Sequence, residues 1–183
     1  MQFNSTILGI ESSCDDTSSA IIKNGKIKAN IISSQDVHRK YGGVVPELAS
    51  RAHQANIIPV IDQTLKQSET AMEDLDAIAV TQGPGLMGSL IVGFNTAKGL
   101  SLSLNKPLIG VNHLQAHVAA LYIEHEVVFP MICLLVSGGH TQLLLVEDHF
   151  NYKIIGIPKH SEESGVKVNT ISLKEKMEIN STI

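Results

Sequence analysis

The sequence predicts an α/β fold built on a mixed sheet, and three observations support this prediction. Strand-like apolar runs alternate with helix-like runs after an opening hairpin. Hydrophobic residues make up 43% of the 183 residues, which is enough for a sizeable core. Two segments, ILGIESSCDDTSSAII and ICLLVSGGHTQLLLV, share the order apolar strand, small-residue turn, apolar strand. A duplicated α/β domain and a chance similarity of two hairpins account for this repeat equally well.

The first part of the chain predicts a strand, a hairpin and a long helix, in that order. STILGIE is a short strand-like run, and residues 17–33 read as two strands joined at Asn24-Gly25, a strong hairpin signal. Residues 46–68 predict a helix, with Pro46 suited to its first turn. Its apolar stripe is expected to comprise Leu48, Ala52, Ala55, Ile58, Ile61 and Leu65.

Later elements follow from the same patterns. The expected order is a buried strand at 74–81, an apolar helix at 86–105, a strand at 107–111, one helix at 113–125 and three strands across 129–156. From residue 157 the chain is polar and charged without a strong period, so disorder is expected there.

Charge and cysteine content exclude several classes of protein. The net charge is −4 and the pI is about 6.0, so the surface is not suited to grip a nucleic acid by charge alone, and a nucleic-acid partner would need another chain. Two cysteines, Cys14 and Cys133, do not make a disulfide framework. No leader-like start and no apolar run of about 18 residues is evident, so the chain is expected to be cytoplasmic.

Two glycine-rich turns are candidates for ligand binding. GPGLMG matches the dinucleotide pattern G-x-G-x-x-G but lacks the acidic residue expected about 20 positions later, so a strand-to-helix turn is the preferred interpretation. VSGGHT, residues 136–141, offers backbone N–H groups and hydroxyls to a phosphate or nucleotide, with a plain hairpin turn as the alternative.

Acidic and histidine side chains form two further candidate sites. Glu11, Asp15 and Asp16 surround one turn, where they could hold Mg²⁺ or position water, although Asp is also an ordinary turn former. His113 and His117 lie four residues apart in NHLQAH, a spacing that places two imidazoles about 5–6 Å apart on one helical face. Half of a metal site and a packed or surface pair both remain open, because a catalytic metal usually takes three protein ligands.

A protease of the HExxH kind is excluded, because it needs Glu directly after the first histidine and this chain has Leu114 there.

Five motifs in order resemble the tRNA N6-adenosine threonylcarbamoyltransferase family, the TsaD/Gcp type formerly called O-sialoglycoprotein endopeptidase. They are GIESSCDDTS, YGGVVPELASRAH, TQGPGLMGSLIVG, NHLQAH and LLVSGGHTQLLLV, and the resemblance runs from about Ile7 to Gly156. It implies the actin-like ATPase superfold shared by sugar kinases and Hsp70. It further implies a first lobe at 1–112, a metal-site helix and the opening strands of the second lobe at 113–156, and an unmatched tail at 157–183.

The resemblance also implies an activity and its site. The activity is transfer of a threonylcarbamoyl group from threonylcarbamoyl-adenylate to N6 of the adenosine next to the anticodon of ANN-reading tRNAs. His113 and His117 would be metal ligands for Fe²⁺, alternatively Zn²⁺, and Asp15 and Asp16 would be catalytic. The site for the Mg-nucleotide or the adenylate would comprise Leu135, Val136, Ser137, Gly138 and Gly139. The implied partners are tRNA, an actin-like paralogue and an ATPase subunit, with no membrane.

The resemblance stops at Gly156, so the chain is expected to be an incomplete, N-terminal version of the transferase that makes no product by itself. The strands after residue 129 would then leave an apolar sheet face exposed. The alternative function is a non-catalytic actin-like interaction subunit or pseudoenzyme fragment. The histidine pair favours descent from the transferase, because the non-catalytic paralogues that this family resembles lack it.

Overall fold

The computed structural model of the chain describes residues 4–35, 38, 41–137 and 141–157, and it divides into two compact units. The first unit runs to Ala116 and the second begins at His117. This division falls inside helix α3 (His113–Ala119), four residues beyond the boundary expected at residue 113. The expected tail, 157–183, lies outside the described residues except for Ile157 itself.

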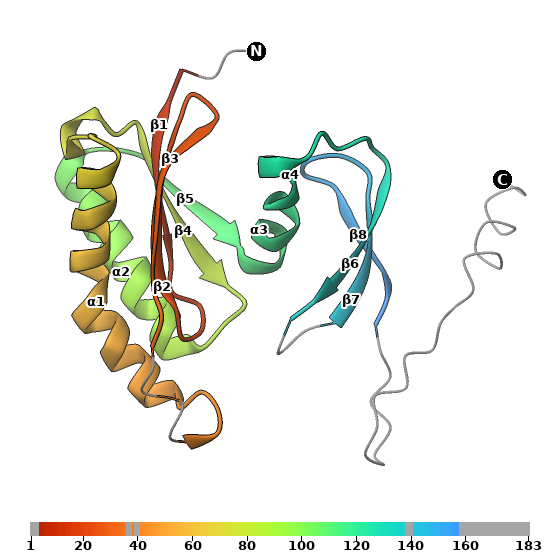
Figure 1. The fold of residues 1–183 in the computed structure, drawn as a ribbon, viewed down its shortest axis with the longest axis horizontal. Coiled ribbons are helices and arrows are strands. Elements are labelled where there is room, and N and C mark those ends of the chain that lie inside the picture. Colours follow the sequence, from red (N-terminus) through yellow and green to blue (C-terminus); the bar gives the residue numbers. More distant parts are fainter. Residues whose placement is uncertain (1–3, 36–37, 39–40, 138–140, 158–183) are drawn as a thin grey trace, which may run out of the picture. The chain divides into compact units, whose positions relative to one another are not determined.

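The first unit is built on a five-stranded mixed sheet with the strand order β3-β2-β1-β4-β5 (Figure 1). Its strands are β1 (Thr6–Glu11), β2 (Thr17–Lys23), β3 (Lys26–Ser33), β4 (Ala77–Gly83) and β5 (Leu108–Asn112). Strands β1, β2 and β3 pair antiparallel, whereas β1 with β4 and β4 with β5 pair parallel. The predicted mixed sheet is therefore confirmed.

The β2–β3 hairpin forms where the sequence predicted it. Asn24 and Gly25 make the turn with φ angles of 55° and 74°. Both angles lie in the left-handed region that a two-residue hairpin turn of type I′ requires, and Asn and Gly are the residues that adopt it most readily. Local turn chemistry therefore sets the pairing next to the turn, Lys23 opposite Lys26, and a β-bulge between Ile21 and Ile22 shifts the register beyond it.

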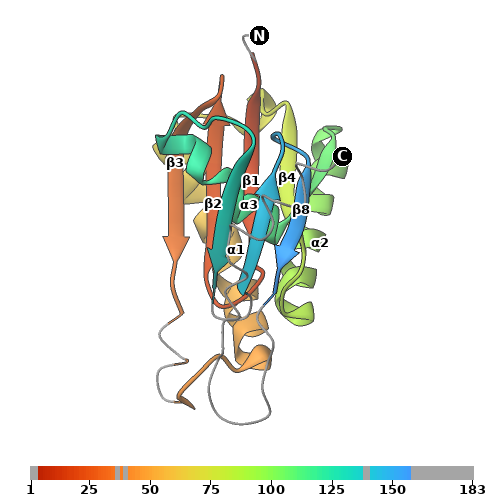
Figure 2. The ribbon, with the colours of Figure 1, turned by 90° about the vertical axis from the view of Figure 1, so that its right-hand side faces the viewer.

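Two long helices cover one face of this sheet (Figures 1 and 2). They are α1 (Pro46–Gln67) and α2 (Met87–Leu104), with a short 3₁₀ turn at Met72–Asp74. The buried aliphatic core between helices and sheet comprises Leu8, Ile10, Ile21, Ile57, Ile61, Leu65, Leu75, Ile78, Val80 and Ala97. Both helices begin and end within two residues of the predicted positions.

The predicted apolar stripe of α1 is partly wrong. Ile58 is 59% exposed, whereas the buried face includes the polar residues His53 and Thr64, each 0% exposed. Both polar side chains are hydrogen-bonded inside the first unit, Thr64 to the carbonyls of Ser19 and Val60. A helix face chosen by hydrophobicity alone cannot anticipate polar groups whose burial depends on partners from other elements.

The second unit begins with part of one helix and continues as an antiparallel three-stranded sheet. Beyond α3 it contains α4 (Leu121–Glu124), β6 (Met131–Val136), β7 (Thr141–Val146) and β8 (Tyr152–Gly156), with the strand order β6-β7-β8. The single helix predicted at 113–125 is thus divided in two. At the division Tyr122 packs edge-on against Phe129 and His149, with ring centroids 5.9 and 5.1 Å away. These contacts come from outside the helix, so its own periodicity could not reveal them.

One face of the second sheet is apolar and exposed, as the sequence predicted. Along β6, Ile132, Leu134 and Val136 are 50%, 63% and 68% exposed, while Leu135 between them is buried. Since successive strand residues point to opposite faces, the three exposed side chains share one face. None of the helices in the described part of the chain combines the length and the apolar content that crossing a bilayer requires.

Candidate functional site

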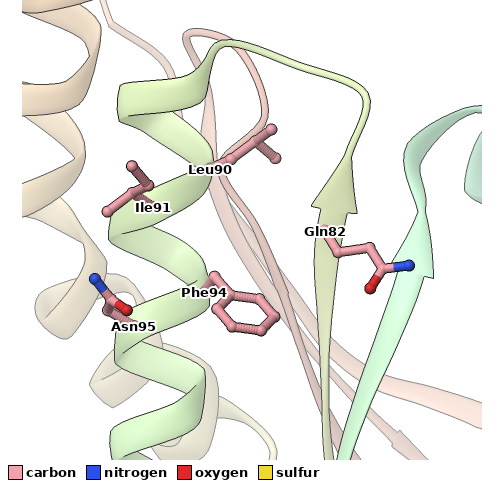
Figure 3. Close-up of a pocket in the computed structure, with 5 residues that line it drawn as sticks. All are labelled: Gln82, Leu90, Ile91, Phe94 and Asn95. Carbon is pink, nitrogen blue, oxygen red and sulfur yellow. The ribbon is translucent and has the colours of Figure 1, made fainter.

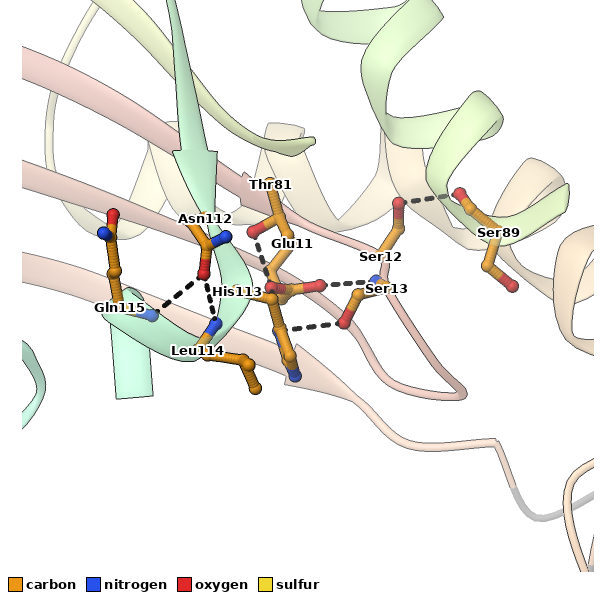
Figure 4. Close-up of polar contacts among 9 residues, drawn as sticks. All are labelled: Glu11, Ser12, Ser13, Thr81, Ser89, Asn112, His113, Leu114 and Gln115. Atoms are coloured by element: carbon orange, nitrogen blue, oxygen red, sulfur yellow. Dashed lines mark hydrogen bonds and ion pairs between the residues drawn. The ribbon is translucent and has the colours of Figure 1, made fainter. Parts of the chain in front are cut away.

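Three parallel strands of the first unit end at the same edge of the sheet, and polar side chains gather there (Figure 4). Glu11 is the last residue of β1, Thr81 lies near the end of β4, and Asn112 is the last residue of β5. His113, the first residue of α3, follows directly. The carboxyl ends of parallel strands are the usual place for ligands in α/β folds, so this edge is the candidate site.

Glu11 is the centre of this polar cluster. Its Oε2 accepts a hydrogen bond from the Thr81 hydroxyl at 2.6 Å and lies 3.1 Å from Nδ1 of His113, while its Oε1 accepts the Ser13 N–H. Burial raises the pKa of the Glu11 carboxyl, but the hydrogen bonds from Thr81, Ser13 and His113 together bring this pKa below its ordinary value. The site therefore holds Glu11 as a carboxylate.

The contacts of His113 define which ring nitrogen carries the proton. Nδ1 lies 3.1 Å from Glu11 Oε2 and 3.1 Å from the Ser13 hydroxyl oxygen. A carboxylate can only accept, so Nδ1 is the protonated nitrogen, and in the neutral ring Nε2 carries the lone pair. A serine–histidine–glutamate nucleophile relay is excluded, because it requires Ser13 and Glu11 to contact different nitrogens.

Helix α3 begins at His113 because Asn112 caps it. The Asn112 side-chain oxygen accepts the backbone N–H groups of Leu114 and Gln115 at 3.0 and 3.2 Å. Asn is among the best N-cap residues, since its side chain satisfies N–H groups that have no partner within the helix. The cap thereby sets the helical start that places His113 beside Glu11.

His117 lies one turn further along α3 and is exposed. It is also the first residue of the second unit. Imidazole nitrogens suit iron and zinc, and a metal-ligating histidine usually donates its other N–H to a carboxylate, as His113 does here. Within the described ranges, no group of three or more His, Cys, Asp or Glu side chains could hold a metal ion. His113 and His117 are thus of the right kind to hold a metal, and the described part of the chain adds no third ligand to them.

Asp15 and Asp16 lie in the turn between β1 and β2, Asp15 half-buried and Asp16 exposed. Cys14 is exposed, but partial desolvation, together with the hydrogen bond and the negative charge of the neighbouring Asp15, raises the pKa of its thiol. Because a thiol must ionise to attack, Cys14 is not an activated nucleophile.

The glycine-rich turn before α2 packs against the β1–β2 turn. Leu86 donates its N–H to the Ser13 carbonyl at 2.7 Å, and the Ser12 hydroxyl donates to the Ser89 carbonyl at 2.8 Å. A Cβ on Gly85 would lie 2.5 Å from the Ser13 carbonyl oxygen, so only glycine fits there. The interpretation of GPGLMG as a strand-to-helix turn is confirmed.

The residues expected to bind the adenylate belong to the second unit. Leu135 and Val136 end β6, with Leu135 buried and Val136 exposed, and the half-buried Ser137 follows. Gly138 and Gly139 lie outside the described residues. Their role stays a prediction.

A shallow hollow of about 530 Å³ lies elsewhere in the first unit, between α2 and β4 (Figure 3). It is lined by Gln82, Leu90, Ile91, Phe94 and Asn95. No acid, base or metal-ligating group is among these lining residues, and none of the predicted site residues contributes to it. We assign it no chemistry.

Three residues of the polar cluster were not singled out from the sequence. Thr81 and Ser13 carry no sequence signal, because their importance depends on partners 70 and 100 residues away. Asn112 could have been found, since Asn directly before an apolar helical run is an N-cap signal. Glu11 was noted only as one of three carboxylates around a turn.

The sequence matches a family model and named relatives. A family model described as tRNA N6-adenosine threonylcarbamoyltransferase matches residues 26–180. Relatives that bear this name include one from Phocaeicola vulgatus, 57% identical over 156 residues, and one from Kosmotoga olearia, 52% identical over 152 residues. In each case the match covers 82% of this chain and 46% of the relative, so the chain spans about half the length of these relatives.

Solved structures resemble the fold at low sequence identity. YeaZ from Pseudomonas aeruginosa is 17% identical with a TM-score of 0.55, covering 86% of this chain and 72% of that one. A second structure is described as an uncharacterized protein with similarity to peptidase YeaZ from the same organism. It is 18% identical with a TM-score of 0.54, and the match covers 88% of this chain and 70% of that one. These likenesses concern the fold alone, and they confirm the α/β class predicted from the sequence.

Proposed function

This chain belongs to the tRNA N6-adenosine threonylcarbamoyltransferase family, and from that membership we propose that it carries the N-terminal part of that family's transfer site. The proposed reaction moves a threonylcarbamoyl group from threonylcarbamoyl-adenylate to N6 of the adenosine next to the anticodon of ANN-reading tRNAs. The N6 nitrogen forms a bond to the carbamoyl carbon, the bond from that carbon to the phosphate oxygen breaks, and AMP leaves. One proton leaves N6 in the same step.

The residues at the sheet edge have defined roles in this proposal. His113 and His117 would hold Fe²⁺ or Zn²⁺, which when bound supplies Lewis acidity toward the carbamoyl carbonyl. Glu11 keeps the proton of His113 on Nδ1, so that Nε2 would be the ring nitrogen that holds a bound metal. Asp15 and Asp16 lie in the adjoining turn, where a carboxylate can accept the proton that leaves N6.

Further parts of the proposal concern substrate and partners. The segment from Leu135 to Gly139 would contact the adenylate, because hydroxyl and backbone N–H groups can donate hydrogen bonds to phosphate oxygens. The net charge of the chain is −4, so tRNA would be bound jointly by this chain and its partner subunits. The proposed partners are an actin-like paralogue and an ATPase, and the proposed location is the cytoplasm.

The contact between Glu11 and His113 is the observation that carries the proposal. A half-buried carboxylate could accept hydrogen bonds from Thr81 and Ser13 for structural reasons alone. Its third contact, however, is to an imidazole whose other nitrogen is thereby prepared to bind a metal. A packed surface histidine needs no such orientation, so this contact favours the half-metal-site interpretation over a packed pair.

A chimera tests the proposal. Residues 1–157 of this chain replace the aligned part of the Phocaeicola vulgatus relative, and the product is incubated with tRNA, ATP, threonine, bicarbonate and the partner proteins of that organism. We expect threonylcarbamoyl-adenosine in the digested tRNA, and loss of at least about 100-fold in rate with His113→Ala. The 183-residue chain is assayed beside it, and no product is expected from it alone.

His125→Ala is the matched control, because His125 is an exposed histidine that follows α4 in the same chimera. Its rate should equal that of the unsubstituted chimera. A folded chimera without product, or one that keeps its rate with His113→Ala, contradicts the proposed function.

A further inference from the structure

His53 lies on the buried face of α1 and contacts both ends of the turn that carries the two aspartates. Its side chain is 0% exposed. Nε2 lies 3.0 Å from the backbone carbonyl oxygen of Cys14, and Nδ1 lies 2.7 Å from the hydroxyl oxygen of Thr17, which is itself fully buried. One imidazole ring thus bridges two positions that flank Asp15 and Asp16.

The chemistry of the partners assigns the protons of this bridge. The Cys14 carbonyl can only accept, so Nε2 of His53 carries a proton and donates it. In the neutral ring Nδ1 is then the acceptor, and the Thr17 hydroxyl donates to it. Both ring nitrogens of His53 are therefore used, and removing the contact with Thr17 would leave a buried polar group without its partner.

The other side of the turn is held from α2. Ser12 donates to the Ser89 carbonyl and the Ser13 carbonyl accepts the Leu86 N–H. The backbone of the turn is consequently tied to α2 before Cys14 and to α1 at Cys14 and Thr17. Because the chain is held on both sides of positions 15 and 16, these contacts limit where the two carboxylates can lie.

We propose that His53 is a positioning residue for the transfer reaction, which sets the placement of Asp15 and Asp16 by clamping the β1–β2 turn to α1. The inference rests on the proposed function for the role of the two aspartates. His53 touches no reacting atom in this scheme and acts only through the turn. A buried histidine that merely fills the core would stabilise the unit without controlling the turn, and the two roles make different predictions.

The Cys14 thiol reports the geometry of the turn without any assay of activity. Cys14 is hydrogen-bonded to Asp15, and its pKa is raised by burial and by the charges of Asp15 and Asp16. Cys14 is exposed in the folded chain, so a loosened turn acts on its thiol by separating it from these carboxylates. The thiol then ionises at lower pH and is alkylated faster. Cys133 belongs to the second unit and serves as an internal reference.

The experiment measures iodoacetamide alkylation of Cys14 and Cys133 in the 183-residue chain, by peptide mass spectrometry, between about pH 7 and pH 9.5. In His53→Leu the Cys14 profile should move to lower pH, with a rate at pH 8 about threefold or more above wild type. His53→Gln keeps one donor and one acceptor, so it should restore most of the wild-type profile. The Cys133 profile should stay unchanged throughout.

His38 provides a matched control, because it is also a buried histidine, bonded to Gln35 and to the Val45 N–H away from the turn. His38→Leu should destabilise the chain and leave the Cys14 profile as in wild type. If His53→Leu does not fold, Thr17→Val removes one of the two clamp contacts and should shift the Cys14 profile in the same direction.

An unchanged Cys14 profile in folded His53→Leu, or in Thr17→Val, overturns the proposal, as does an equal acceleration of Cys133. In the chimera, His53→Leu should lower kcat with little change in KM, and His53→Gln should recover it. An unsubstituted chimera without product would refute the proposed function and leave the clamp intact, so the two failures are distinguishable.

Discussion

Nδ1 of His113 lies 3.1 Å from Oε2 of Glu11, although 102 residues separate them in the sequence. Strand β1 ends at one of these residues and helix α3 begins at the other, and the parallel sheet brings both to one edge. The contact gives the candidate site its orientation, because it decides which imidazole nitrogen is offered to a ligand.

Replacing Glu11 should therefore weaken metal binding without removing any proposed ligand. Glu11→Gln should lower the Zn²⁺ affinity of the chain by about 10–100-fold at constant pH, as measured by competition with a chromogenic chelator. Glu47→Gln, at an exposed position on α1, is the charge-matched control and should leave the affinity unchanged. Equal affinities in wild type and Glu11→Gln would mean that the carboxylate has a structural role alone.

Asp15→Asn should accelerate the alkylation of Cys14. The negative charge and the hydrogen bond of Asp15 help to raise the pKa of this thiol, so at any pH below that pKa the thiolate fraction is small and the reaction slow. Removing the charge lowers the pKa and increases the thiolate fraction, by about threefold or more at pH 8. Burial alone raises the pKa of Cys133, so its rate should not change, and a parallel change at both thiols would contradict this account.

Two glycines offer a test with opposite signs. Gly85→Ala places a methyl group 2.5 Å from the Ser13 carbonyl oxygen, so we expect the free energy of unfolding to fall by about 1–3 kcal/mol. Gly99→Ala, in the interior of α2 with nothing within 4 Å of the new methyl group, should raise it by about 0.5–1 kcal/mol. Urea unfolding measures the free energy of unfolding of both variants. If Gly99→Ala lost as much stability as Gly85→Ala, the loss at Gly85 could not be attributed to its close approach to the Ser13 carbonyl.

Two isoleucines on α1 test which face of the helix is buried. Ile61 is 2% exposed and belongs to the core cluster, so Ile61→Ala should cost about 2–5 kcal/mol. Ile58 is 59% exposed, so Ile58→Ala should change the free energy of unfolding by about 0.5 kcal/mol or less. Similar costs at both positions would support the stripe predicted from the sequence over the observed one.

The exposed face of the second sheet should make the chain self-associate. Leu134→Lys places a charge on this face and should reduce concentration-dependent light scattering. Leu135→Lys is the neighbouring control, because its buried side chain points to the opposite face and a charge there should instead unfold the sheet. Scattering that Leu134→Lys leaves unaltered would place the self-association elsewhere.

Local chemistry accounts for what the sequence alone could predict. The Asn24-Gly25 hairpin, the two long helices and the β4 and β5 strands depend on turn residues and periodicity within short windows, and they form close to where they were expected. The histidine pair and the aspartates could be named as candidates for the same reason, since each lies in a short recognisable motif.

Tertiary structure decided everything that depends on distant partners. The division of the helix at 113–125, the burial of His53 and Thr64 on α1, and the cluster of Glu11, Ser13, Thr81 and His113 all involve groups that lie far from one another in the chain. A polar side chain is stable inside a protein only when it has a hydrogen-bond partner. The packing of the sheet and helices decides which residue that partner is, and the neighbouring residues in the sequence do not. The sequence by itself therefore determined the elements and the candidate residues, and the fold determined which of them meet.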